Sequence, residues 1–231
     1  MYENIIGVVG GMGSYATAHF FRELLDSFPA EKEWERPRII VDNNCVMPSR
    51  VRAVLYGEEK EKLINALSAA VNGLNALGCS KIILACITSH SFLKHLKISH
   101  PEKLKIIDLL AATADAAKTE NEIYICCTEG TTQLRLWDRY FETDTRLIYP
   151  SSQELAELRE FIEAVKQNKI TDETIAAFSA FIEGVSCGSL ILGCTELPVL
   201  YKQQKHGLKP YRKQVYDPLQ CGINVLKAGL A

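Results

Sequence analysis

The chain has 231 residues, of which 47% are hydrophobic and 23% charged, and its formal net charge is −2 at pH 7. This composition is typical of a folded protein of one or two domains and excludes a disordered chain. The charges form no basic block, which argues against nucleic acid as a partner, and no apolar run approaches the roughly 20 residues of a membrane helix. Because the N-terminus also lacks the pattern of a signal peptide, we expect a cytoplasmic protein that does not bind membranes.

The apolar periodicity predicts strands alternating with helices along almost the whole chain. In the first half we expect strands at 5–9, 38–42, 81–85 and 105–108, and helices at 15–28, 58–77, from about 88, and 109–118. In the second half we expect strands at 122–127, 145–149, 189–193 and 215–217, and helices at 131–141, 153–167, 172–183 and after 217.

This alternation favours parallel sheets covered by helices, and a weak repeat divides the chain in two. Residues 5–13 and 123–131 both run from an apolar strand into a turn, and the segments around Cys86 and Cys194 match in the same order. We therefore expect an α/β fold of two similar lobes, each a mainly parallel sheet flanked by helices. A pseudo-two-fold axis would relate the lobes, with the active site in the cleft between them.

The lobe boundaries follow from the repeat. We expect the first lobe to comprise residues 1–107 plus 208–231 and to carry Cys86, and the second to comprise residues 108–207 and to carry Cys194. The terminal segment is assigned to the first lobe because a lone final strand needs a sheet to join.

Cys86 and Cys194 each end a short apolar strand and lie close to a threonine, Thr88 or Thr195. Sites in parallel α/β folds lie at the carboxyl ends of strands, where a following helix dipole favours a thiolate. Two opposed thiols suit a reaction in which a proton leaves one face of a carbon and returns on the other. Either cysteine alone is more typical of a buried packing residue, and it is the paired setting that favours chemistry. The eight cysteines show no zinc-ligand spacing and no sign of a disulfide framework, so we expect free thiols.

Two turns supply further candidates. Gly11-x-Gly13-x-x-Ala16 satisfies a dinucleotide-binding fingerprint, although it is equally typical of an anion-binding turn or a simple tight turn. In the other half, Thr128 begins a Thr/Gly turn whose donors would stabilise a charged carboxylate or would only cap a helix.

A set of motifs then resembles one family in order and spacing. The motifs are Gly10-Gly11-Met12-Gly13, Pro48-x-Arg50, Cys86-x-Thr88-x-His90, Thr128-x-Gly130-Thr131 and Gly193-Cys194-Thr195-Glu196-Leu197-Pro198. Over essentially its whole length the chain resembles aspartate racemases of the aspartate/glutamate racemase family. The resemblance implies an amino-acid racemase that uses no cofactor and no metal, with Cys86 and Cys194 as the acid/base pair.

The resemblance also implies a substrate site. Asn43, Thr88, Thr131 and Thr195 would hold the α-carboxylate or amino group, and Arg50 and Lys166 the side-chain carboxylate, with Met12, Thr128 and Glu196 completing the site. Without the family, Lys166 is typical of a solvated helix lysine. Glu196 would orient or repel a thiolate at Cys194.

The sequence departs from the family pattern most clearly at Ile87. The usual Cys-Asn-Thr reads Cys86-Ile87-Thr88, and isoleucine has no hydrogen-bonding group. Ser14 also stands where proline is common, and Gln133 begins a stretch that lacks the usual Ser-Gly.

We expect a racemase of a small acidic amino acid, aspartate or glutamate, and the resemblance suggests a homodimer. Three alternatives remain: a one-cysteine lyase or isomerase of the decarboxylase or maleate isomerase kind, a nucleotide-binding protein, and a non-catalytic amino-acid-binding protein.

Overall fold

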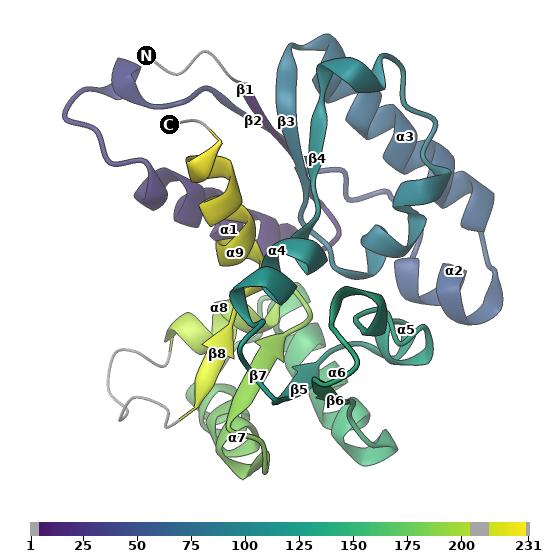
Figure 1. The fold of residues 1–231 in the computed structure, drawn as a ribbon, viewed down its shortest axis with the longest axis vertical. Coiled ribbons are helices and arrows are strands. Elements are labelled where there is room, and N and C mark those ends of the chain that lie inside the picture. The colour runs from purple at the N-terminus through teal and green to yellow at the C-terminus, as the bar shows by residue number, and fades with distance from the viewer. Residues whose placement is uncertain (1–4, 204–212, 230–231) are drawn as a thin grey trace.

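A computed structural model describes residues 5–203 and 213–229 and contains two four-stranded parallel sheets (Figure 1). The first has the order β2-β1-β3-β4 and the second β6-β5-β7-β8. The strands are β1 (Ile5–Val9), β2 (Ile39–Asp42), β3 (Cys79–Leu84), β4 (Lys105–Ile107), β5 (Glu122–Cys126), β6 (Arg146–Ile148), β7 (Ser189–Leu192) and β8 (Gln214–Tyr216). Because the two strand orders correspond, the predicted fold of two similar α/β lobes is confirmed.

Helices cover both sheets. They are α1 (Ser14–Ser27), α2 (Arg50–Tyr56), α3 (Lys60–Ala76), α4 (Leu109–Ala116), α5 (Glu129–Gln133), α6 (Ser152–Lys166), α7 (Asp172–Gly184), α8 (Leu197–Gln203) and α9 (Pro218–Ala228), with 3-10 helices at Glu33–Glu35, Thr88–His95, Pro101–Lys103 and Asp138–Tyr140. Several starts are fixed by capping side chains, as where Ser151 accepts from the backbone N–H of Glu154. None of the helices in the described ranges is long and apolar enough to cross a bilayer.

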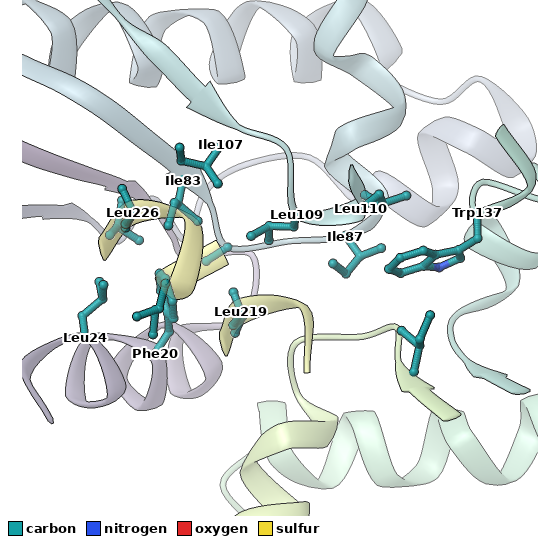
Figure 2. Packing of buried hydrophobic residues seen from close by; sticks show 14 of the residues in the cluster. Phe20, Leu24, Ile83, Ile87, Ile107, Leu109, Leu110, Trp137, Leu219 and Leu226 are labelled. Carbon is teal, nitrogen blue, oxygen red and sulfur yellow. The ribbon is translucent and has the colours of Figure 1, made fainter. Parts of the chain in front are cut away.

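Three hydrophobic clusters form the core, and one of them is shared by both lobes. Helix α3 packs through Leu67 and Val71 on the face of the first sheet opposite the shared cluster. Helices α6 and α7 cover the corresponding face of the second sheet. The shared cluster joins the inner faces of both sheets through α1, α4 and α9. Figure 2 shows part of it, running from Phe20 and Leu226 to Trp137. The inner faces of the two lobes are therefore packed through one continuous apolar core.

The last strand corrects one expectation. β8 pairs with β7 in the second sheet, with Leu190 opposite Val215, so the prediction that this strand joins the first lobe is wrong. The physical reason is the repeat itself: β4 extends the first sheet beside β3, and β8 occupies the equivalent edge beside β7. After β8, α9 packs on α4 and α1. The predicted segment also includes residues 208–212 and 230–231, which lie outside the described residues.

Two predicted helices also differ. Instead of one helix over residues 131–141, the structure has the short α5, then a left-handed residue at Arg135 (φ 43°), then a 3-10 turn. This break turns the chain so that the indole of Trp137 is fully buried in the shared core. The segment after Cys86 forms a 3-10 helix rather than an α-helix.

Candidate functional site

A small cavity of about 30 Å³ brings together residues from the strand ends of both lobes. Both thiols lie on it, and each is almost buried, with 8% of Cys86 and 9% of Cys194 exposed. The cavity is lined by Met12, Arg50, Val51, Cys86, Ile87, Thr88, Thr128, Lys166, Gly193, Cys194, Thr195 and Glu196. Nine of the eleven residues predicted for the site are in this lining, and Asn43 and Thr131 are not.

Tight turns after β3 and β7 deliver the two thiols. The N–H of Cys86 donates to the carbonyl of Leu84 at 2.8 Å, and that of Gly193 to the carbonyl of Ile191 at 2.9 Å. At Gly193 the turn passes so close to the neighbouring strand that a Cβ would lie 3.0 Å from the carbonyl oxygen of Cys126. Only glycine fits this approach without a shift.

The Cys194 thiol is held by a carboxylate. Its Sγ donates to Oε2 of Glu196 at 2.9 Å, and Glu196 is itself 2% exposed. Burial, followed by the charge and hydrogen bond of Glu196, raises the pKa of the Cys194 thiol well above its ordinary value. The expectation that a helix dipole favours a thiolate here is therefore wrong: α8 begins only at Leu197, and the nearest full charge is negative.

Glu196 is packed tightly against the opposite wall. A Cβ on Gly13 would lie 2.1 Å from Oε1 of Glu196, so the glycine turn leaves the space that this carboxylate occupies. Oε1 is buried and has no hydrogen-bond partner among the described residues, whereas Oε2 accepts from Cys194 and, at 3.4 Å, from the hydroxyl of Thr195. An unpartnered buried carboxylate oxygen in a cavity is available to a ligand donor.

Two cations face the same cavity. The guanidinium of Arg50 donates to the carbonyls of Met12 at 2.8 Å and Pro48 at 3.1 Å, and its Nε is buried without a partner. Lys166 pairs with Glu163 at 2.8 Å. Burial opposes the charge on Lys166, but the hydrogen bond to Glu163 and the charges of Glu196 and Cys194 together raise its pKa.

Hydroxyl groups bridge the lobes beside these charges. The hydroxyl of Thr88 lies 3.1 Å from that of Thr131 and 3.3 Å from that of Thr128. Thr88 and Thr128 line the cavity, whereas Thr131 is fully buried and does not line it. From the second lobe, the hydroxyl of Thr195 donates to the carbonyl oxygen of Ala85 in the first lobe at 3.5 Å.

Asn43 lies apart from the cavity on an exposed loop. Its amide donates to Oγ of Ser14 at 3.3 Å and to the exposed Cys45 thiol at 3.2 Å. The same loop fills the glycine turn, because a Cβ on Gly11 would lie 2.3 Å from the backbone carbonyl carbon of Asn44. A pyrophosphate cannot occupy a turn that the chain itself fills, which argues against the nucleotide-binding alternative.

His90 supports the Cys86 turn from behind. The N–H of Leu109 donates to its Nε2 at 3.2 Å, so the ring proton is on Nδ1, which lies 2.9 Å from the carbonyl oxygen of Cys86. Burial lowers the pKa of His90, consistent with this neutral form. The His90 ring therefore fixes the backbone of the turn that carries Cys86.

Two apolar residues of the lining, Val51 and Ile87, were not predicted as site residues. Val51 lies in the first turn of α2, which Ser49 caps and which was not among the predicted helices. Ile87 lines the cavity and also packs in the shared core, where Figure 2 shows it beside Trp137.

The fold is similar to those of solved racemases. An aspartate racemase from Picrophilus torridus matches with a TM-score of 0.84 and 23% identity, covering 98% of this chain and 94% of its own. For a glutamate racemase from Thermus thermophilus the TM-score is 0.67, with 18% identity and coverage of 99% and 80%. For an allantoin racemase from Klebsiella pneumoniae it is 0.59, with 16% identity and coverage of 99% and 90%.

The sequence itself matches a family model. The model described as Asp/Glu/Hydantoin racemase matches residues 9–226, which include every residue of the cavity. The chain therefore belongs to the Asp/Glu/Hydantoin racemase family of isomerases.

Proposed function

We propose that this enzyme is a cofactor-independent racemase of a small acidic amino acid, aspartate or glutamate, and that Cys86 and Cys194 are its two bases. The observation that carries the proposal is the position of the thiols, which come from different lobes and border one cavity of about 30 Å³. A single small ligand between the lobes would touch both sulfurs.

The charges of the cavity match those of an acidic amino acid. Arg50 and Lys166 supply two positive charges and Glu196 one negative charge. Aspartate and glutamate carry two carboxylates and one ammonium, so each charge has a counterpart, and the unpartnered Oε1 of Glu196 suits an ammonium donor. The apolar side chains of Val51 and Ile87 limit the remaining space.

The lobes must separate for a substrate to enter. A water molecule needs roughly 10–15 Å³ of such volume, so the cavity holds about two waters. An amino acid with nine or ten non-hydrogen atoms does not fit. We infer that binding and release involve opening of the cleft, as in other enzymes that close around a substrate.

The chemistry needs one thiolate and one thiol. The Cys86 thiolate removes the α-proton and becomes a thiol, while the Cys194 thiol donates its proton to the opposite face of Cα and becomes a thiolate. The roles exchange in the reverse direction. Glu196 keeps the proton on Cys194 before the reaction, since its charge opposes ionisation of that thiol. Arg50 and the hydroxyls of Thr88 and Thr195 stabilise the charge that develops on the substrate carboxylate.

The test is proton exchange in heavy water with each enantiomer of aspartate and glutamate. We expect the wild-type enzyme to interconvert the enantiomers with deuterium incorporated at Cα, and Cys86→Ser and Cys194→Ser each to lose roughly 10²–10⁴-fold in rate. Cys45→Ser is the matched control because its thiol is exposed and outside the cavity lining. A single cavity variant that racemises at nearly the wild-type rate would refute the two-base assignment.

One observation favours the one-cysteine alternative. The two sulfurs are unequal, because only Cys194 hydrogen-bonds a carboxylate among the residues that the structure describes. If Cys86 alone did the chemistry, deuterium would enter Cα without inversion, or a covalent adduct would form on one thiol. The same incubations, followed by mass spectrometry of the protein, separate these outcomes from racemisation.

A further inference from the structure

Helix α1 connects both lobes to the catalytic cavity. Its N-terminus follows the glycine turn whose Met12 lines the cavity. Phe20 and Leu24 pack in the shared core against the first sheet, whereas Ala16 packs in the core of the second lobe. A change in the position of this helix relative to the second lobe therefore changes the cavity.

Helix α8 has the corresponding place on the other wall. It begins at Leu197, directly after Cys194, Thr195 and Glu196, and Lys202 lies in its last turn. Lys202 is five positions after Leu197 in the helix, a distance of about 7.5 Å along the axis. The two helices are in contact, as Figure 1 shows near the junction of the lobes.

An ion pair joins these two helices. Nζ of Lys202 pairs with the carboxylate of Glu23 on α1. Of the ion pairs among the residues that the structure describes, it is the one that links the lobes, while the others join residues of the same lobe. The side chains of Lys202 and Glu23 are only 31% and 18% exposed, so solvent and salt screen this pair less than a surface pair.

Other ionisable groups surround the pair. Asp217, the N-cap of α9, interacts electrostatically with Lys202. Burial raises the pKa of Asp217 to about 6. His19 on α1 also faces Glu23 and Lys202, with Arg22 nearby, and burial lowers its pKa. Near neutral pH, the charge of Lys202 therefore interacts with the carboxylates of both Glu23 and Asp217, close to the imidazole of His19.

We infer that Glu23 and Lys202 are positioning residues, which hold α1 against α8 and so favour the closed form of the cleft over the open form. Neither residue lines the cavity that holds the two thiols. Breaking the pair shifts the enzyme toward an open cleft, because α1 and α8 then lose the charged contact that links them. This role extends the proposed racemase function, and only the predicted effect on activity depends on that function.

The primary measurement does not depend on activity. In a Cys45→Ser background, which removes the exposed thiol, iodoacetamide alkylation of Cys86 and Cys194 is followed by peptide mass spectrometry. We expect Lys202→Met and Glu23→Gln to raise the alkylation rate of these thiols about five-fold, the effect of losing one half-buried ion pair. Lys202→Arg should restore the wild-type rate, and Lys62→Met, which removes an ion pair within the first lobe, should leave it unchanged.

The double variant Glu23→Gln/Lys202→Met separates a lost attraction from an uncompensated charge. We expect its alkylation rate to be close to that of either single variant, because one pair is lost in each case. In kinetics, we expect kcat to fall by at most the factor by which the alkylation rate rises, because closure around the bound substrate loses the same contact.

Two outcomes are decisive and distinct. Unchanged alkylation in both single variants, with only a lowered melting temperature, overturns the inference and leaves the proposed function untouched. Raised alkylation in an enzyme that racemises neither aspartate nor glutamate supports the role of the pair and refutes the proposed substrate.

Discussion

The two walls of the cavity come from one sequence pattern but hold their sulfurs differently. On the first wall, the backbone carbonyl of Cys86 accepts from the hydroxyl of Ser89 at 2.6 Å and is contacted by the neutral ring of His90. On the second, the thiol of Cys194 donates to the carboxylate of Glu196. On the first wall, these contacts fix the backbone at Cys86. On the second wall, the hydrogen bond fixes the proton of the Cys194 thiol. A repeated motif therefore positions two equivalent atoms, while side chains outside the repeat make them electrostatically different.

Among variants that keep both thiols, the largest effect is expected from removing this difference. Glu196→Gln keeps the shape of the side chain but removes the charge that opposes ionisation of Cys194. We expect racemisation to fall by about 10²-fold, since the proton on Cys194 is no longer held in place for donation. Initial rates with each enantiomer provide the measurement.

The control for this variant is Glu163→Gln, which removes the carboxylate that pairs with Lys166 but does not contact a thiol. Its loss of activity should be much smaller. An equal loss in both variants would show that Glu196 acts through the charge balance around Lys166 instead of through Cys194.

The free energy of unfolding at high pH tests the effect of Glu196 on Cys194 in the absence of substrate. Burial and Glu196 raise the pKa of Cys194 above its ordinary value of 9.0, so the folded protein binds this proton more tightly than the unfolded chain. The contribution to stability is present below about pH 9 and is lost as the pH rises toward the folded pKa, by up to about 1.4 kcal/mol per pH unit. Urea unfolding between pH 8 and 10.5 measures this loss.

In Glu196→Gln the free energy of unfolding should fall less steeply over this range. The comparison of variants is necessary because burial also raises the pKa of Cys126 and Cys127. Parallel curves for the wild type and the variant would mean that Glu196 does not control the Cys194 proton.

These contrasts show what the sequence made predictable. The strands were found because each is a short run that contains apolar residues, and the cavity was found because Cys86 and Cys194 lie two residues after the ends of two of them. The partner of β8 was assigned wrongly because a three-residue strand does not itself specify which sheet it joins, whereas the repeated topology does. The sequence does not show the raised pKa of Cys194, which depends on the burial of the thiol and then on the direction of the Glu196 side chain. Lys166 was found only through the family resemblance.

A smaller effect is expected at the hydroxyls that bridge the walls. Thr131 is fully buried and its hydroxyl lies 3.1 Å from that of Thr88, which lines the cavity. Thr131→Val should leave the Thr88 hydroxyl with only its longer contact to Thr128, at 3.3 Å, and lower kcat/KM about ten-fold, the effect of one buried hydrogen bond.

Two variants make this test specific. Thr131→Ser keeps the hydroxyl and should retain most of the activity. Thr132→Val removes a neighbouring hydroxyl that lies beside Cys127 at 3.2 Å, and it should change kcat/KM little. A loss with Thr132→Val as large as that with Thr131→Val would point to a general packing defect.

The smallest effect is expected at Ile87, where the first wall meets the shared core. Its side chain is 2% exposed and packs in the same cluster as Trp137, so its main contribution is burial. Ile87→Val removes one methylene and should lower the free energy of unfolding by about 1 kcal/mol. Because the lost group makes no hydrogen bond, kcat/KM should change less than the ten-fold expected for Thr131→Val. Urea unfolding and initial rates together check this, and a larger loss of activity than of stability would make Ile87 a determinant of substrate choice.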